Sequence, residues 1–351
     1  MEKTVDRGFH SRFLLLMEYS SLTVLKRVPV PGRRSRLSRG HILWFQAKLF
    51  KHTLVLTLFI GMSFFANNRD LYATDPQSWS LFASRGNRID WSALTQQAAS
   101  AEVVLFGELH NNPVAHWLQL QLMQSLVLSG KTQTTVRQNQ WCLGLEMFST
   151  DQNAVLAEWS KNLINDNSLE NDIRLWPNYK TDYQPLLHFA RSRNFCIFGS
   201  NAPRRYANLV ARKGFDALAD LPREALPWLP RLPIDFDPEI PSYKRMQQMK
   251  SAAHGSHGLP WLAQAQALKD ATMAWQIRRR IIANQRVLHI NGRYHSDNQE
   301  GIVWYLKRMR PDTQMITIST ATQSDVSTLQ PTNYDLADYI IIVDESFPGS
   351  Y

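Results

Sequence analysis

The stretch Val103-Val104-Leu105-Phe106-Gly107-Glu108-Leu109-His110-Asn111-Asn112-Pro113 predicts a buried strand, a turn and the start of a helix. The four apolar residues 103–106 are typical of a strand that is covered on both faces. Asn112 suits the N-cap of a helix, and Pro113 suits its first position, where a missing N–H costs nothing. Glu108 and His110 are therefore expected beside a helix N-terminus at the carboxyl end of a strand, where open α/β sheets bind ligands.

The same arrangement recurs along the chain. Apolar segments 142–145, 195–198 and 286–290 predict three more strands, and their ends carry Glu146, Asn201 and His295. The connections are long enough for parallel crossovers, and segments 315–319 and 339–343 predict two further strands. The predicted fold class is α/β, with a mostly parallel open sheet flanked by helices.

One long segment breaks the alternation of strands and helices. Residues 206–283 contain no convincing strand, and their composition predicts helices near 206–218, 243–253 and 262–283 around a proline-rich passage at 222–241. We interpret residues 206–283 as a helical insertion or cap on the sheet.

The positive charge lies almost entirely at the start of the chain. Net charge is +9, and residues 1–52, with eleven Lys/Arg and three Asp/Glu, contribute +8 of it. The remaining residues carry +1 and no basic stripe or nucleic-acid motif, so no nucleic-acid partner is expected.

Residues 53–65 form an apolar run that follows the basic segment. Its length suits the core of a secretory signal and is short for a membrane span. We expect residues 1–73 to be a basic leader with a signal peptide or N-terminal anchor, and residues 74–351 to form the domain. The protein is then expected to be exported, with membrane contact only through its N-terminal segment.

The two cysteines, Cys142 and Cys196, stand near the beginnings of predicted strands. Neighbouring parallel strands would bring the two sulfurs close together. Because disulfide geometry is demanding, we expect two buried free thiols rather than a bridge.

In a parallel sheet, all the strand ends share one edge. Glu108, His110, Glu146, Asn201 and His295 are therefore expected together. Two carboxylates, two imidazoles and a carboxamide suit a divalent metal such as Zn or Mn, acid–base chemistry, or the polar edge of a cofactor. Each residue taken alone is equally explained as a helix cap or a satisfied polar group.

Several motifs together resemble the ChaN-like haem-binding uptake proteins of the Tiki/TraB/erythromycin-esterase superfamily. Gly107-Glu108-Leu109-His110 resembles the opening motif of that family. The further matches follow in order at 144–148, 183–186, 201–204, 266–274 and 292–295. No lipid-attachment cysteine is present, which departs from the family.

This resemblance implies haem, iron uptake, a tyrosine phenolate on the iron, a homodimer with haem at its interface, and an outer-membrane haem receptor as partner. It assigns the iron ligand to Tyr183 first and Tyr179 second. Arg204 and Arg205 are candidates for pairing with the propionates, and His254 and His257 for the far side of the haem. The residues expected to contact the cofactor are Tyr183, Tyr179, His110, Glu108, Glu146, Asn201, Arg204 and His295.

The same superfamily offers a second hypothesis, a hydrolase of the protease or esterase type. In it, Glu108, His110, Glu146 and His295 surround a divalent metal or act as acid–base groups. The match around Tyr183 and the match at 266–274 favour haem binding without turnover.

Overall fold

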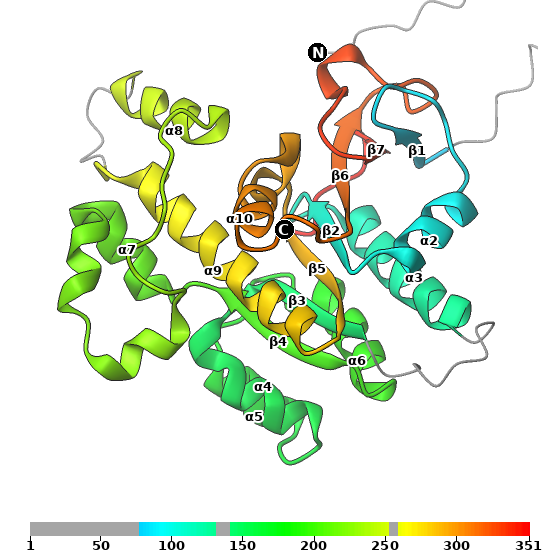
Figure 1. The fold of residues 1–351 in the computed structure, drawn as a ribbon. Coiled ribbons are helices and arrows are strands. Elements are labelled where there is room, and N and C mark those ends of the chain that lie inside the picture. Colours follow the sequence, from blue (N-terminus) through cyan, green and yellow to red (C-terminus); the bar gives the residue numbers. More distant parts are fainter. Residues whose placement is uncertain (1–76, 131–140, 253–258) are drawn as a thin grey trace, which may run out of the picture. The chain divides into compact units, whose positions relative to one another are not determined.

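The computed structural model describes residues 77–130, 141–252 and 259–351, which are built around a seven-stranded sheet (Figure 1). Its strands are β1 (Trp79–Ala83), β2 (Val103–Glu108), β3 (Trp141–Ser149), β4 (Cys196–Asn201), β5 (Arg286–Gly292), β6 (Met315–Gln323) and β7 (Tyr339–Asp344). The spatial order is β1-β7-β6-β2-β5-β3-β4. Only β1 and β7 pair in antiparallel fashion, which confirms the predicted mostly parallel α/β sheet.

Helices flank this sheet. They are α2 (Trp91–Ser100), α3 (Pro113–Gly130), α4 (Asn153–Ser160), α5 (Asp166–Asp172), α6 (Gln184–Ser192), α7 (Arg204–Lys213), α8 (Pro241–Ala252), α9 (Leu262–Ile282) and α10 (Ile302–Met309). Figure 1 shows α3 on one side of β5 and α9 with α10 on the other. Alternate residues of β2 pack against the helices on the two sides of the sheet, because successive side chains of a strand point to opposite faces. Val104 and Phe106 join the apolar core of α3 and α6, and Val103 and Leu105 join that of α9 and α10.

The segment 206–283 contains no strand among its described residues, as predicted. Tyr206, Val210, Leu229 and Leu268 form part of a separate apolar cluster within it. Helix α9 also contacts β3, β4 and β5. The insertion is thus a helical layer held on the sheet by α9.

Two elements were not predicted. Strand β1 lies in a polar stretch and pairs in antiparallel fashion at the edge of the sheet, so its sequence carries little of the continuous apolar signal of the central strands. Helix α5 falls in an Asn- and Asp-rich segment, where the side chain of Asn165 accepts the backbone N–H of Ser168 at 2.9 Å. Burial of Leu169 then fixes this short helix against the core.

Some predictions fall outside the described residues. These are the leader and apolar run within residues 1–73, together with His254 and His257. Within the part of the chain that the structure describes, no helix combines the length and the apolar character that a membrane crossing requires.

Candidate functional site

The carboxyl ends of β2, β3, β4 and β5 bring the predicted polar residues together. The backbone N–H of Gly292, at the end of β5, donates to Oε2 of Glu146 at 2.7 Å. Nε2 of His295 lies 3.1 Å from Oε1 of Glu146, and Nδ2 of Asn201 donates to the backbone carbonyl of Glu146 at 3.2 Å. Glu146 therefore links three strand ends into one polar cluster.

Glu108 and His110 form a carboxylate–imidazole pair next to this cluster. Nδ1 of His110 lies 2.9 Å from Oε1 of Glu108, which keeps the proton on that nitrogen. Burial lowers the pKa of His110, but the hydrogen bond to Glu108 and the charge of Glu146 outweigh it, and the pKa is raised overall. The His110 side chain is 39% exposed, and its Nε2 has no hydrogen-bond partner among the described residues. That nitrogen is open to a ligand.

Two neighbours fix the orientation of the His110 ring. Trp176 meets it edge-to-face with 4.7 Å between ring centroids. On the other side, a Cβ at Gly292 would lie 2.7 Å from Cε1 and 2.8 Å from Nε2 of His110. Glycine at 292 is therefore required for this position of the imidazole.

Buried polar side chains hold the turn that carries Glu108 and His110 in place through hydrogen bonds. The backbone carbonyl of His110 accepts Nδ2 of Asn178 at 2.7 Å and lies 3.0 Å from Nε2 of His116. Nδ2 of Asn178 also donates to Asp182 at 2.6 Å, and Gln119 donates to Oε2 of Glu108 at 2.5 Å. Sequence reasoning did not single out these residues, although a polar side chain inside an otherwise apolar helix, as at His116, marks such a position.

His295 differs from His110 because both of its nitrogens face carboxylates. Nδ1 contacts Oδ1 of Asp270 in α9, and Nε2 faces Glu146. Burial lowers the pKa of His295, but the charges of Glu146 and Asp270 and the hydrogen bonds to both raise it to about 10. Asp270 also accepts the hydroxyl of Tyr243 at 2.7 Å. His295 is therefore a buried imidazolium that joins the sheet to α9 and α8.

The two tyrosines predicted as iron ligands are both buried. Tyr183 is 1% exposed, and its hydroxyl donates a hydrogen bond to Oε1 of Glu108. Burial, followed by the charge of Glu108, raises its pKa well above the ordinary value. Burial, with the nearby charges of Asp166 and Glu170, raises the pKa of Tyr179 to about 12. The hydroxyl of Tyr179 is buried without a hydrogen-bond partner among the described residues. Both phenols hold their protons in this arrangement.

Comparison with known proteins identifies the family. The profile of the haem-binding uptake family ChaN, of the Tiki superfamily, matches residues 94–306. The chain belongs to this family. No curated protein matches the chain closely enough to be counted as a relative.

The fold of this ChaN-family chain is similar to a solved structure described as cofacial haem binding to ChaN of Campylobacter jejuni. That likeness has a TM-score of 0.57 at 18% identity and covers 76% of this chain and 97% of the other. The type III effector HopBA1 is more distant, with a TM-score of 0.40, 13% identity and coverage of 72% and 91%. A mutant of erythromycin esterase EreC in its open conformation has a TM-score of 0.39 at 12% identity. That likeness covers 70% of this chain and 77% of the other.

The donor set at the carboxyl edge includes one nitrogen that could meet the iron of a haem. Nε2 of His110 is an exposed, unpaired imidazole nitrogen with a carboxylate behind it, which is the arrangement of many metal-ligating histidines. Trp117, 51% exposed, and Tyr294, 70% exposed, follow the β2 and β5 ends and offer aromatic surface. Among the described residues, no group of three or more His, Cys, Asp and Glu is arranged to hold a metal ion.

The two predicted propionate partners differ in availability. Arg204 begins α7 and is exposed, and among the described residues it has no ion-pair partner. Arg205 pairs with Asp151 at 2.5 Å and lies over the rings of Tyr206, at 4.6 Å, and Trp228, at 4.9 Å. Of the two, Arg204 is the guanidinium that is free to meet an anion.

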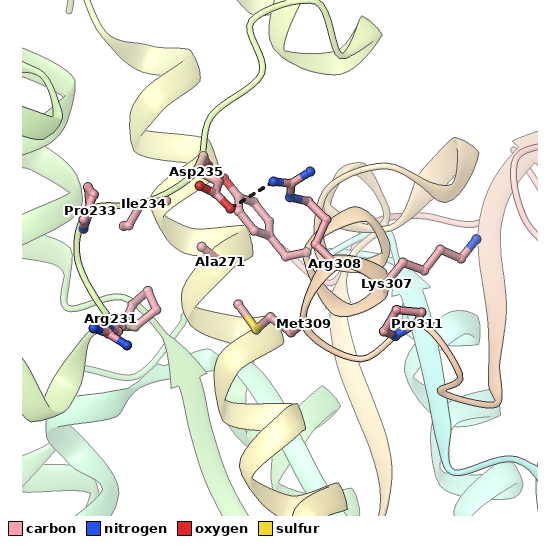
Figure 2. A pocket seen from close by; sticks show the side chains of 11 residues that line it. Arg231, Pro233, Ile234, Asp235, Ala271, Lys307, Arg308, Met309 and Pro311 are labelled. Carbon is pink, nitrogen blue, oxygen red and sulfur yellow. Dashed lines mark hydrogen bonds and ion pairs between the residues drawn. The ribbon is translucent and has the colours of Figure 1, made fainter.

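A cavity of about 400 Å³ lies away from these residues (Figure 2). Its lining comes from the proline-rich passage, α9 and the end of α10: Pro230, Arg231, Pro233, Ile234, Asp235, Ala271, Tyr305, Lys307, Arg308, Met309 and Pro311. Arg308 pairs with Asp235 across it at 3.2 Å. None of the strand-end residues lines this cavity, so it is separate from the carboxylate–imidazole pair.

Proposed function

We propose that this chain binds haem at the carboxyl edge of its sheet, with Nε2 of His110 as the nitrogen that meets the iron. The observation that carries the proposal is the unpaired, partly exposed Nε2 of an imidazole whose Nδ1 is held by Glu108. Membership of a haem-binding uptake family supports haem as the ligand. When bound, the haem would supply an iron that accepts a ligand from the protein.

The residues around His110 have defined tasks in this proposal. Glu108 fixes the tautomer of the imidazole and makes Nε2 a stronger donor. Trp176 and Gly292 fix the ring plane. Trp117 and Tyr294 offer apolar contact to the macrocycle, and Arg204 offers a guanidinium to a propionate.

Ligation by tyrosine remains a prediction. Tyr183 would have to exchange its hydrogen bond to Glu108 for the iron and lose a proton that burial holds firmly. Tyr179 would have to lose a proton that its burial holds as well. We place His110 first because its nitrogen needs no such rearrangement.

The proposal also includes the location of the protein and its partners. Export of the chain, periplasmic or membrane-associated location, and a haem receptor as partner follow from the expected leader and the family's uptake role. A homodimer is proposed on membership of the ChaN family, because the resemblance to that family implies haem at a dimer interface.

The test is a haemin titration of the full chain, followed by absorption spectroscopy. Saturable binding with a stoichiometric end point supports the proposal, and a linear, non-saturating response contradicts it. Tyr183→Phe and Tyr179→Phe separate the imidazole from the phenolate assignments: an unchanged spectrum in both variants favours His110, and a lost or shifted spectrum in either variant favours the phenolate.

A hydrolase remains the second candidate, because the Glu108–His110 pair also suits a general base that activates water. His295 is unsuited to that role, since its pKa of about 10 keeps it protonated. Turnover of ester or amide substrates that is lost in His110→Gln and kept in His295→Gln would favour the hydrolase. The absence of turnover in the folded wild-type protein over an ester and amide panel would count against it.

A further inference from the structure

Cys142 and Cys196 lie side by side at the beginnings of two parallel strands. They are Cα partners in the register of β3 and β4, and both are free thiols. Neighbouring strands are about 4.8 Å apart, and bridged cysteines have Cα atoms roughly 4.4–6.8 Å apart. A disulfide between them therefore requires little movement of the backbone.

The two thiols differ in access to solvent. Cys142 is fully buried within β3, whereas Cys196 is partly exposed at the first position of β4. Strand β4 is the last strand of the sheet, so it has a strand neighbour on one side only. Of the two residues, Cys196 is therefore the one that an external reagent meets first, and the edge strand can adjust to let the second sulfur follow.

A guanidinium lies near the pair. The charge of Arg280 acts on both thiols, and the group lies 4.6 Å from the ring centroid of Phe198. Its Nε is buried without a hydrogen-bond partner among the described residues. Hydrogen bonding from Cys142, together with the charge of Arg280, lowers the pKa of Cys196 to about 7 despite burial. A thiolate at Cys196 places an anion near the guanidinium of Arg280, whose Nε has no hydrogen-bond partner among the described residues.

We propose that Cys142 and Cys196 form a dithiol exchange site at which an external disulfide is reduced while the two cysteines become bridged. The Cys196 thiolate attacks one sulfur of the external disulfide, whose S–S bond breaks and whose other half leaves as a thiolate that takes up a proton. The Cys142 thiol loses its proton and its sulfur attacks Cys196, releasing the second half as a thiol. The protein loses two protons and two electrons, and the external disulfide gains them.

The experiment uses the reduced full chain and oxidised glutathione under native conditions, with acid quenching and mass spectrometry. Wild-type protein should lose two hydrogens, retain no glutathione and yield a cross-linked peptide that joins Cys142 to Cys196. Cys142→Ala should retain one glutathione on Cys196, and Cys196→Ala should stay unmodified. Wild-type protein that keeps glutathione without a bridge, or Cys196→Ala that reacts as fast as wild type, would overturn the proposal.

Alkylation rates give a second measurement that does not depend on either cysteine variant folding. With neutral iodoacetamide, the rate for Cys196 should rise with a midpoint near pH 7. Arg280→Gln should move this midpoint upward, whereas Arg279→Gln, the exposed neighbour that lies over Trp275, should leave it unchanged. A wild-type midpoint near the ordinary value of 9.0 would contradict the proposal.

Discussion

The two imidazoles at the carboxyl edge have different chemistry because their neighbours differ. His110 has one carboxylate on Nδ1 and an open Nε2, whereas His295 has a carboxylate on each nitrogen. The arrangement around His110 suits a ligand or a base, and the arrangement around His295 suits a structural cation. The sequence placed both residues at this edge, but it could not separate their roles, because Asp270 reaches His295 from a helix distant in sequence.

His295 should make stability depend on pH in the alkaline range. Its folded pKa of about 10 lies above the free value of 6.5, so its contribution is complete below pH 6.5 and is lost as the pH rises through 10. His295→Gln should flatten the fall in unfolding free energy between pH 7 and 10, measured by urea denaturation. It should also cost about 3–5 kcal/mol at pH 7, because two carboxylates lose their buried partner. An unchanged alkaline slope in the variant would contradict this role.

Gly292→Ala should displace the His110 ring without unfolding the protein. The new methyl group would meet the imidazole at less than 3 Å, and a partly exposed side chain can swing away. Haemin affinity should fall by roughly tenfold, in the range expected for loss of an orienting contact. The control is Gly349→Ala, whose methyl group would crowd only Asn111. Equal affinities in the two variants would show that the ring position is unimportant.

At the scale of elements, a hydrogen bond at the N-cap fixes where α3, the helix that follows β2, begins. Asn112 accepts the backbone N–H of Ala115 at 2.9 Å, as predicted from the Asn-Pro pair. Asn112→Ala should lower the unfolding free energy by about 1 kcal/mol in urea denaturation. Asn111→Ala, a change in an exposed neighbouring side chain, should cost much less. A larger loss in Asn111→Ala than in Asn112→Ala would contradict the capping assignment.

The interior strands could be predicted because two-sided burial leaves runs of apolar residues, which are continuous at 103–106 in β2 and at 339–343 in β7. Edge strand β1 and the short helix α5 could not be predicted from the sequence, because strand pairing and packing with distant residues determine them. The strand-end residues of the candidate site followed from the parallel topology alone. The positions of Asn178 and Asp182 could not be predicted in this way. Asn178 donates to the backbone carbonyl of His110, which lies in a distant segment of the sequence.

At the scale of the whole molecule, residues 74–351 form one unit by their internal contacts. Residues 1–73 carry most of the net charge, and the family match lies wholly within residues 74–351. A chain that begins at residue 74 should therefore fold and bind haemin with the affinity of the full chain. Circular dichroism and titration of both proteins test this. A truncated chain that folds but binds at least roughly tenfold more weakly would contradict this prediction and would show that residues 1–73 contribute to binding.

The most direct test of the central claim compares haemin titrations of His110→Ala and His188→Ala with wild type. His188 is a partly exposed histidine that faces Asp166 at 3.4 Å and lies on α6, outside the carboxylate–imidazole pair. The proposal predicts that His110→Ala loses the bound-haem spectrum and at least roughly tenfold in affinity, while His188→Ala matches wild type. A folded His110→Ala protein with wild-type spectrum and affinity would contradict the assignment of haem to Nε2 of His110.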